Sequence, residues 1–172
     1  MFALLNYYFM EIKPRSFYTV RFNDCDPFSH LNNSKYIDYF LNAREDHLKA
    51  SYGIDLKEWA RQGHTFVVSR HEIQYIRPVT YNELICIQST LIGMGETTLQ
   101  VEMLMMDKEA QNLRSILWTT FTRVDAGTGK RSAHPQAFLD QFGQLMAPDI
   151  DSAKGIDIRI SALLDRPLPA SS

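Results

Sequence analysis

The stretch from Asn33 to Tyr52 constrains the fold more than any other part of this sequence. Side chains suited to burial recur along it with a period near 3.6, and polar side chains fill the opposite face. The buried face holds Tyr36, Ile37, Phe40, Leu41, Ala43, Arg44, His47 and Leu48. Asn32 or Asn33 suits the N-cap and Gly53 suits the C-terminal end. The pattern predicts one helix of about five turns with a single buried stripe.

Segments rich in β-branched and aromatic residues surround this helix. They predict strands over 16–23, 65–76, 83–92, 97–107 and 113–124, and a short helix near 56–61. Turn-forming residues at 93–95, 107–112 and 125–129 separate the later strands. Strands joined in hairpin succession form an antiparallel sheet, and one long helix can bury its stripe in the curve of such a sheet. We therefore expect an α+β fold.

The chain of 172 residues, 45% of them hydrophobic, is long enough to bury one core. We expect an N-terminal extension over 1–15, one domain over 16–146 and a partly mobile C-terminal tail over 147–172. The apolar residues 1–10 are too short for a membrane span and lack a basic segment before them, so we expect them to pack on the domain or on a partner.

Charge and cysteine content narrow the functional classes. The net charge is −2 and no basic stripe is present, which argues against a nucleic-acid partner. Cys25 and Cys86 are too few for a disulfide framework and match no metal-ligand spacing, which predicts a reducing, cytoplasmic location.

The segment directly before the long helix, residues 24–36, concentrates polar side chains. It carries Asp24, Asp26, His30, Asn32 and Asn33. A carboxylate beside the unpaired N–H groups of a helix N-terminus can act as a base or nucleophile next to an anion-stabilising site. Simpler roles stay open, because aspartates bond turn backbone, a histidine can fix a loop and asparagines cap helices.

Other chemistry is less favoured at this segment. Cys25 lies between two acids, which disfavour its thiolate. Asp24, Asp26 and His30 could form a metal trio, but no second ligand set lies nearby in sequence. His64 and His71 are seven residues apart in a strand region, so alternation places them on opposite faces unless a bulge intervenes. We expect no metal and no cofactor.

In its order of motifs the chain resembles the hotdog-fold acyl-CoA thioesterases of the 4-hydroxybenzoyl-CoA thioesterase type. The resemblance covers roughly residues 17–142 and rests on the Asp-x-Asp strand end, the loop with His30, the paired asparagines, the following tyrosine and the corner at 77–79. It implies a hotdog fold, a curved antiparallel sheet wrapped around one long central helix, and hydrolysis of an acyl or aroyl thioester carried by CoA or by an acyl-carrier protein.

The resemblance also implies roles for individual residues. Asp26 would attack the thioester carbonyl or activate a water, the N–H of Asn33 would stabilise the oxyanion, and His30 would assist. Substrate would contact Tyr36, Phe40, Phe66, Ser69 and Arg70. The sites of this family form at a dimer interface, so Asp26 would meet the partner's residues 69–73 in a homodimer or homotetramer. The apolar strand 113–124 is the expected pairing edge.

Three departures from the family pattern leave alternatives open. Ser29 replaces a frequent glycine, Asn82 and Glu83 replace a Gly-Asp pair, and the hairpin after residue 92 carries no basic residue. CoA phosphates would then need other cations, such as Arg70, Arg77 or Arg123. A non-catalytic acyl-thioester binding protein is the first alternative. Hydration of an enoyl thioester is a weaker one, since Asp38, Asp46 and His47 form no convincing Asp–His pair.

Overall fold

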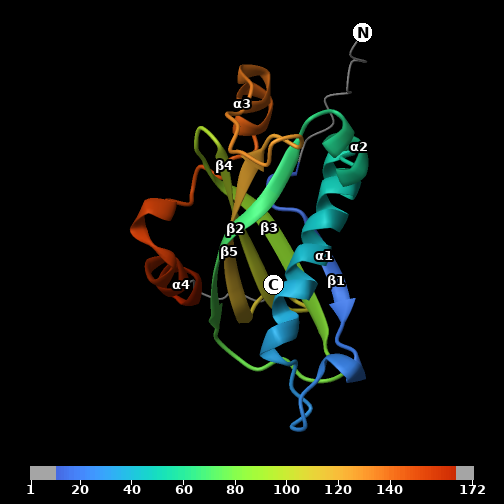
Figure 1. Ribbon diagram of the computed structural model, residues 1–172. Coiled ribbons are helices and arrows are strands. Elements are labelled where there is room, and N and C mark those ends of the chain that lie inside the picture. The colour runs from blue at the N-terminus through green and yellow to red at the C-terminus, as the bar shows by residue number, and fades with distance from the viewer. Residues whose placement is uncertain (1–10, 166–172) are drawn as a thin grey trace.

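The computed structural model describes residues 11–165 and consists of one curved sheet with helices on both faces (Figure 1). The elements in chain order are β1 (Arg15–Thr19), η1 (Phe22–Asp24), α1 (Asn33–Tyr52), α2 (Leu56–Arg61), β2 (Thr65–Tyr75), β3 (Leu84–Met94), β4 (Thr98–Asp107), β5 (Leu113–Val124), α3 (Gln136–Gly143), η2 (Ser152–Lys154) and α4 (Ile156–Leu164). The expected α+β class is confirmed. No helix within residues 11–165 has both the length and the apolar character needed to cross a bilayer.

The long helix α1 has the bounds that its sequence pattern predicts. The Asn32 side chain caps it by accepting a hydrogen bond from the Ser34 N–H, and Gly53 ends it in the left-handed conformation with a φ of 64°. Its buried residues lie against the concave face of the sheet, together with alternate residues of β3, β4 and β5. One face of α1 therefore forms the main core.

The strand order is β1-β3-β4-β5-β2, and all neighbouring strands are antiparallel. Only β3, β4 and β5 follow one another as hairpins, so the expected succession of four hairpin strands is wrong for β2. The segment between Tyr75 and Leu84 crosses the end of the sheet, with Val79 fully buried, and β2 pairs with β5 at the far edge. The expected pairing edge at 113–124 is wrong too, since β5 lies inside the sheet.

The outer face of the sheet is covered by the C-terminal segment. Ala147, Ile150 and Ile156 are buried against residues of β3, β4 and β5 that alternate with those facing α1. Figure 1 shows α4 on the side of the sheet opposite α1. The part of the expected tail as far as residue 165 therefore packs on the sheet. Residues 1–10 of the expected extension and 166–172 of the expected tail lie outside the described residues, and the boundaries of the extension, the domain and the tail stay predictions.

The first strand is shorter than its sequence pattern predicts. It ends at Thr19 instead of Asn23, because Val20 turns into the core and residues 22–24 form a 3-10 turn. This turn brings Asp24 and Asp26 below the start of α1.

An ion pair fixes α4 to the outer face of the sheet. Two nitrogens of the Arg159 guanidinium, Nε and Nη2, donate to the Glu102 carboxylate at 2.9 and 2.8 Å. The Trp118 indole N–H donates to the same carboxylate at 3.1 Å. Glu102 is only 1% exposed. A carboxylate this buried depends on its cationic partner.

We expect Arg159→Met to lower the free energy of unfolding by about 3 kcal/mol, because it leaves the Glu102 carboxylate buried without a counter-charge. Urea unfolding followed by circular dichroism measures the change. Lys154→Met, which removes a long, exposed contact to Asp151 of 3.8 Å, is the control and should cost less than about 1 kcal/mol. Equal effects of the two changes would contradict the assignment.

Candidate active site

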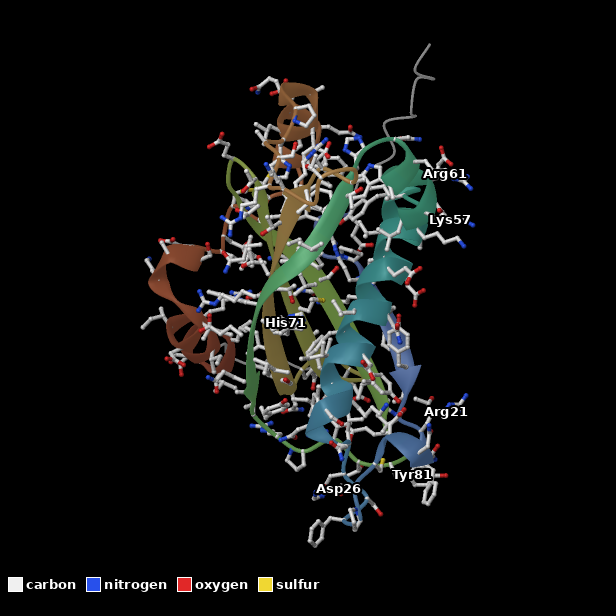
Figure 2. All side chains as sticks on the ribbon, in the orientation of Figure 1. Arg21, Asp26, Lys57, Arg61, His71 and Tyr81 are labelled. Atoms are coloured by element: carbon white, nitrogen blue, oxygen red, sulfur yellow. The ribbon has the colours of Figure 1, made fainter. Side chains whose placement is uncertain are left out.

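Asp26 lies in the loop below the N-terminus of α1, as Figure 2 shows. Its Oδ1 accepts hydrogen bonds from the N–H groups of Phe28 at 2.9 Å and of His30 at 3.0 Å. Its own N–H donates to the His30 carbonyl at 2.7 Å. Within the described residues, Oδ2 has no hydrogen-bond partner. One oxygen of Asp26 thus organises the loop while the other is left available for chemistry.

The loop is held against the crossover that leads from β2 to β3. The Leu31 N–H donates to the Val79 carbonyl at 2.8 Å, and the Tyr81 N–H donates to the Ser29 carbonyl at 2.9 Å. Ser29 adopts a φ of 62°, in the left-handed region that glycine occupies more readily. A glycine, which is frequent at this position in the resembled family, would adopt this φ freely, and Ser29 adopts it at some strain.

Asn33 is the first residue of α1, so its N–H has no partner within the helix. No other acceptor for this N–H is found in residues 11–165. The Asn33 carbonyl accepts a hydrogen bond from the Tyr75 hydroxyl at 3.2 Å, which ties the start of α1 to the end of β2. The Asn32 N–H donates to the Asp24 carbonyl at 2.9 Å and so fixes the helix start to the loop.

Asp24 and Cys25 have supporting positions. Asp24 Oδ2 accepts a hydrogen bond from the Tyr39 hydroxyl at 2.8 Å, so its structural role uses a helix side chain instead of the expected turn backbone. Burial and this bond raise the pKa of Tyr39 to about 12. Burial, followed by the charges of Asp24 and Asp26, raises the pKa of the Cys25 thiol. The expected suppression of a Cys25 thiolate is confirmed.

His30 contributes through its backbone in this structure. Its N–H and carbonyl both bond to Asp26, and it forms a bridge to Thr80. Within the described part of the chain its ring makes no hydrogen bond. The loop-fixing role left open by the sequence is therefore the one that these contacts support.

A largely apolar cavity of about 390 Å³ lies under the second half of α1. It is open to solvent on one side and is bordered by α1, α2, the concave face of the sheet and α3. Its aromatic lining comprises Tyr52, Trp59, Phe66, Phe121 and Phe142. Phe66, an expected substrate contact, lines it. Tyr36 and Phe40 are 3% and 0% exposed and belong to the core instead, and neither lines this cavity.

The other expected substrate contacts lie on the edge strand β2. The Ser69 hydroxyl donates to the Thr120 carbonyl at 3.2 Å and accepts from Thr122 Oγ1 at 2.8 Å. Arg70 is exposed and pairs with Glu72 at 2.8 Å. Neither residue contacts Asp26 of its own chain. Asp26 lies at the N-terminal end of α1, whereas the cavity lies under the second half of this helix.

The two further cations considered for CoA phosphates also hold partners. Arg77 donates to the Asn112 side chain at 2.9 Å, and Arg123 donates to the Gly63 carbonyl at 3.1 Å. Figure 2 shows two basic residues that sequence reasoning did not single out, Lys57 and Arg61, pointing outward from α2.

The three residues considered for enoyl hydration have different partners and do not meet. Asp38 is exposed and lies near Lys35, Asp46 accepts a hydrogen bond from Tyr18, and His47 is buried between Ser16 and Ser89. Burial and then the charge of Arg44 lower the pKa of His47 to about 4. No Asp–His pair forms from these three residues.

A bulge in β2 changes the expected placement of the two histidines. The register with β5 shifts between Val68 and Arg70. His64 packs on Trp59 in the main core, and His71 bonds to Thr119, which pairs with Val101 of the same core face. Both therefore face the concave side, as Figure 2 illustrates for His71. No group of three His, Cys, Asp or Glu side chains that could hold a metal ion occurs in residues 11–165.

Residues 20–142 match a family model described as the thioesterase-like superfamily. The long-chain acyl-CoA thioesterase FadM of Escherichia coli strain K12 is 30% identical over 129 residues, which cover 74% of this chain and 95% of FadM.

Solved structures are similar as well. A thioesterase from Thermus thermophilus, complexed with coenzyme A and zinc, is 26% identical with a TM-score of 0.63, over 76% of this chain and 92% of that one. The probable thioesterase YbaW from Escherichia coli is 23% identical with a TM-score of 0.68, over 77% and 98% of the two chains.

Ser29→Gly should raise the free energy of unfolding by about 0.5 to 1 kcal/mol, because it removes a side chain from a left-handed position. Thermal or urea unfolding measures the effect. Ser161→Gly, inside the exposed part of α4, is a matched control that should lower stability by a similar amount. A loss of stability in Ser29→Gly would mean that the Ser29 backbone is not strained.

Proposed function

The chain belongs to the thioesterase-like superfamily and is an acyl-CoA thioesterase of the hotdog fold, and on this premise we propose that Asp26 is its catalytic carboxylate. The observation that carries the proposal is the free Oδ2 of Asp26 at the end of α1 where the Asn33 N–H has no acceptor within the described residues. A carboxylate and an unpaired donor at a positive helix end are the two groups that thioester hydrolysis requires.

The chemistry follows from these two groups. Oδ2 either attacks the thioester carbonyl carbon, releasing the thiolate and leaving an anhydride that water hydrolyses, or takes a proton from the water that attacks instead. Both routes place negative charge on the carbonyl oxygen. The N–H of Asn33 and the dipole of α1 stabilise that charge. Oδ1 stays bonded to the loop throughout, which keeps the carboxylate in position.

The site is completed by a second copy of the chain. In the described residues β2 pairs only on its β5 side, and its Val67 and Val68 are 47% and 42% exposed. A free edge strand with exposed apolar side chains is a pairing surface. We expect two copies to pair antiparallel through β2, which extends the sheet across a two-fold axis.

This pairing brings the cavity of one copy close to the Asp26 loop of the other. In an antiparallel pair, the first half of one β2 lies opposite the second half of the other. Phe66 and Val68, which line the cavity, would then lie near Tyr75 of the second copy, and Tyr75 is bonded to the Asn33 carbonyl. The cavity of one copy thereby receives the acyl group whose carbonyl meets Asp26 of the other.

The substrate class follows from the relatives and from the cavity. FadM is a long-chain acyl-CoA thioesterase, and the cavity offers an apolar wall to an acyl chain. We propose acyl-CoA as the substrate, with an acyl-carrier protein as the less supported carrier. A cytoplasmic location and a choice between dimer and tetramer also stay predictions, the former motivated by the free thiols of Cys25 and Cys86.

A non-catalytic acyl-thioester binding protein is the second candidate. The observation that favours it is the pairing of Arg70, Arg77 and Arg123 with other groups of the protein. Weak recognition of the CoA phosphates would fit a protein that holds an acyl group without turning it over.

Asp26→Asn should lower kcat/KM for acyl-CoA at least about 100-fold, equivalent to roughly 2.7 kcal/mol, because an amide is neither a nucleophile nor a base. Release of free thiol from a panel of short, long and aromatic acyl-CoAs measures it. Asp38→Asn, on the exposed face of α1, is the control and should leave the rate unchanged. Binding of acyl-CoA without turnover by the unmodified protein would favour the second candidate.

Val67→Asp should weaken dimerisation at least about tenfold, because two-fold symmetry places two like charges in the same apolar interface. Activity should fall in parallel, since the site needs both copies. Sedimentation at several protein concentrations measures the association. Ile158→Asp changes an exposed apolar residue of α4, which is 57% exposed, and should leave the association intact. A dimer unaffected by Val67→Asp would exclude the β2 edge as the interface.

A further inference from the structure

The apolar cavity contains one cation whose chemistry is not explained by the fold. Arg44 extends from α1 and is the only arginine or lysine among the described residues that line the cavity. The surrounding wall is aliphatic or aromatic over most of its extent, including Leu91, Leu99 and Val101 of the sheet. Arg44 is half-buried, and its guanidinium is the charged basic group set into this mostly apolar wall.

Arg44 has few partners of its own. Its Nη1 donates to the Ser89 hydroxyl at 3.3 Å, and its guanidinium carbon lies 6.0 Å from the centre of the Tyr52 ring. Ser89 is fully buried and also bonds to His47 Nδ1 at 2.7 Å. Burial lowers the pKa of the Arg44 guanidinium. A side-chain hydrogen bond with Tyr52 opposes this shift. Arg44 is half-buried, and those of its five N–H donors that bond neither Ser89 nor Tyr52 have no acceptor within the described residues.

No carboxylate compensates this charge in the part of the chain that the structure describes. Arg44 forms no ion pair there, and Glu45, the one acid that lines the cavity, is exposed and not paired with it. The contrast with Arg159, which has a bidentate carboxylate partner on the other face of the sheet, is clear.

A half-buried guanidinium in an apolar wall, without a counter-charge, favours a bound anion, because charge-assisted hydrogen bonds are stronger where water is partly excluded. An arginine fork matches a carboxylate in geometry, with two parallel N–H to O bonds. We propose that the cavity binds an apolar chain that bears a carboxylate, with Arg44 as the partner of that carboxylate. The site stands on the cavity and on Arg44, and only its use by an acyl substrate rests on the proposed function.

Binding of decanoate and decan-1-ol to the full chain by calorimetry tests the site without requiring turnover. The unmodified protein should bind decanoate at least about tenfold more tightly than the alcohol of equal length, because only the acid forms a charge-assisted pair. Arg44→Met should abolish this preference while retaining the affinity for the alcohol. Equal affinity of the unmodified protein for the two ligands would overturn the proposal, and this comparison does not depend on the folding of any variant.

Two further variants separate a specific role of Arg44 from general electrostatics. Arg61→Met removes a neighbouring arginine that points outward from α2 and should leave the preference for decanoate unchanged. Arg44→Lys keeps the charge but not the fork and should retain part of the preference. The assignment of Arg44 as the carboxylate partner would be contradicted by either of two results. One is a preference for decanoate that survives Arg44→Met, and the other is an equal loss of that preference in Arg61→Met.

The carboxylate has two possible sources, which kinetics distinguish. If it is the far end of the substrate's acyl group, Arg44→Met should lower kcat/KM for a ten-carbon ω-carboxyacyl-CoA at least about tenfold more than for decanoyl-CoA. If it belongs to a free fatty acid, both thioesters should respond alike while the preference for decanoate over the alcohol persists. Failure of the proposed function would appear as absent turnover with this binding preference intact.

Discussion

Burial of one face of α1 in the concave side of the sheet is the interaction on which the rest of the structure depends. The helix contributes Tyr36, Phe40 and Ala43 to a core that spans β3, β4 and β5. Because the helix lies across the curved sheet, its N-terminus emerges where β2 crosses to β3 and its C-terminal half lies over the cavity. The positions of the loop and of the cavity both follow from this one packing arrangement.

The same packing leaves the start of α1 available for chemistry. A helix start within a protein core would have its N–H groups capped or covered. Here Asn32 caps only the Ser34 N–H, and the Asn33 N–H stays without an acceptor among the described residues. Asp26 is directed to the same end by hydrogen bonds from its own loop. The hydrogen bonds of this loop hold Ser29 at a positive φ, although serine is not the most favourable residue for that conformation.

The sequence predicted what local patterns determine. The bounds of α1 were predicted correctly because capping residues and a helical period mark both ends, and the hairpin turns because glycine and aspartate mark them. The partner of β2 was not predictable in this way, because pairing at the far edge of a sheet depends on contacts distant in sequence. The bulge near Ser69 leaves no marked sequence signal either, although it decides that His64 and His71 share a face.

The sequence contains a pattern that predicts the covering of the outer face of the sheet. The run Met103–Met106 is apolar at successive positions, as a strand buried on both faces requires, so some other part of the chain had to cover the second face. The helix α4 carries out this role, and its apolar period was too short to identify alone. The cavity, in contrast, had no such signal, because it is formed by side chains from α1, α2, the sheet and α3.

The charged groups on the two faces of the sheet differ in their partners, and this contrast bears on function. On the outer face, Glu102 and Arg159 satisfy one another, and Trp118 donates a further bond, so this face is complete without a ligand. On the concave face, Arg44 and the neutral His47 both form hydrogen bonds with the Ser89 hydroxyl. Within residues 11–165 no carboxylate pairs with the Arg44 guanidinium or with the His47 ring. A fold that compensates a buried carboxylate on one face and leaves a half-buried guanidinium unpaired on the other has unsatisfied donors where a ligand can reach them. The apolar cavity is that place.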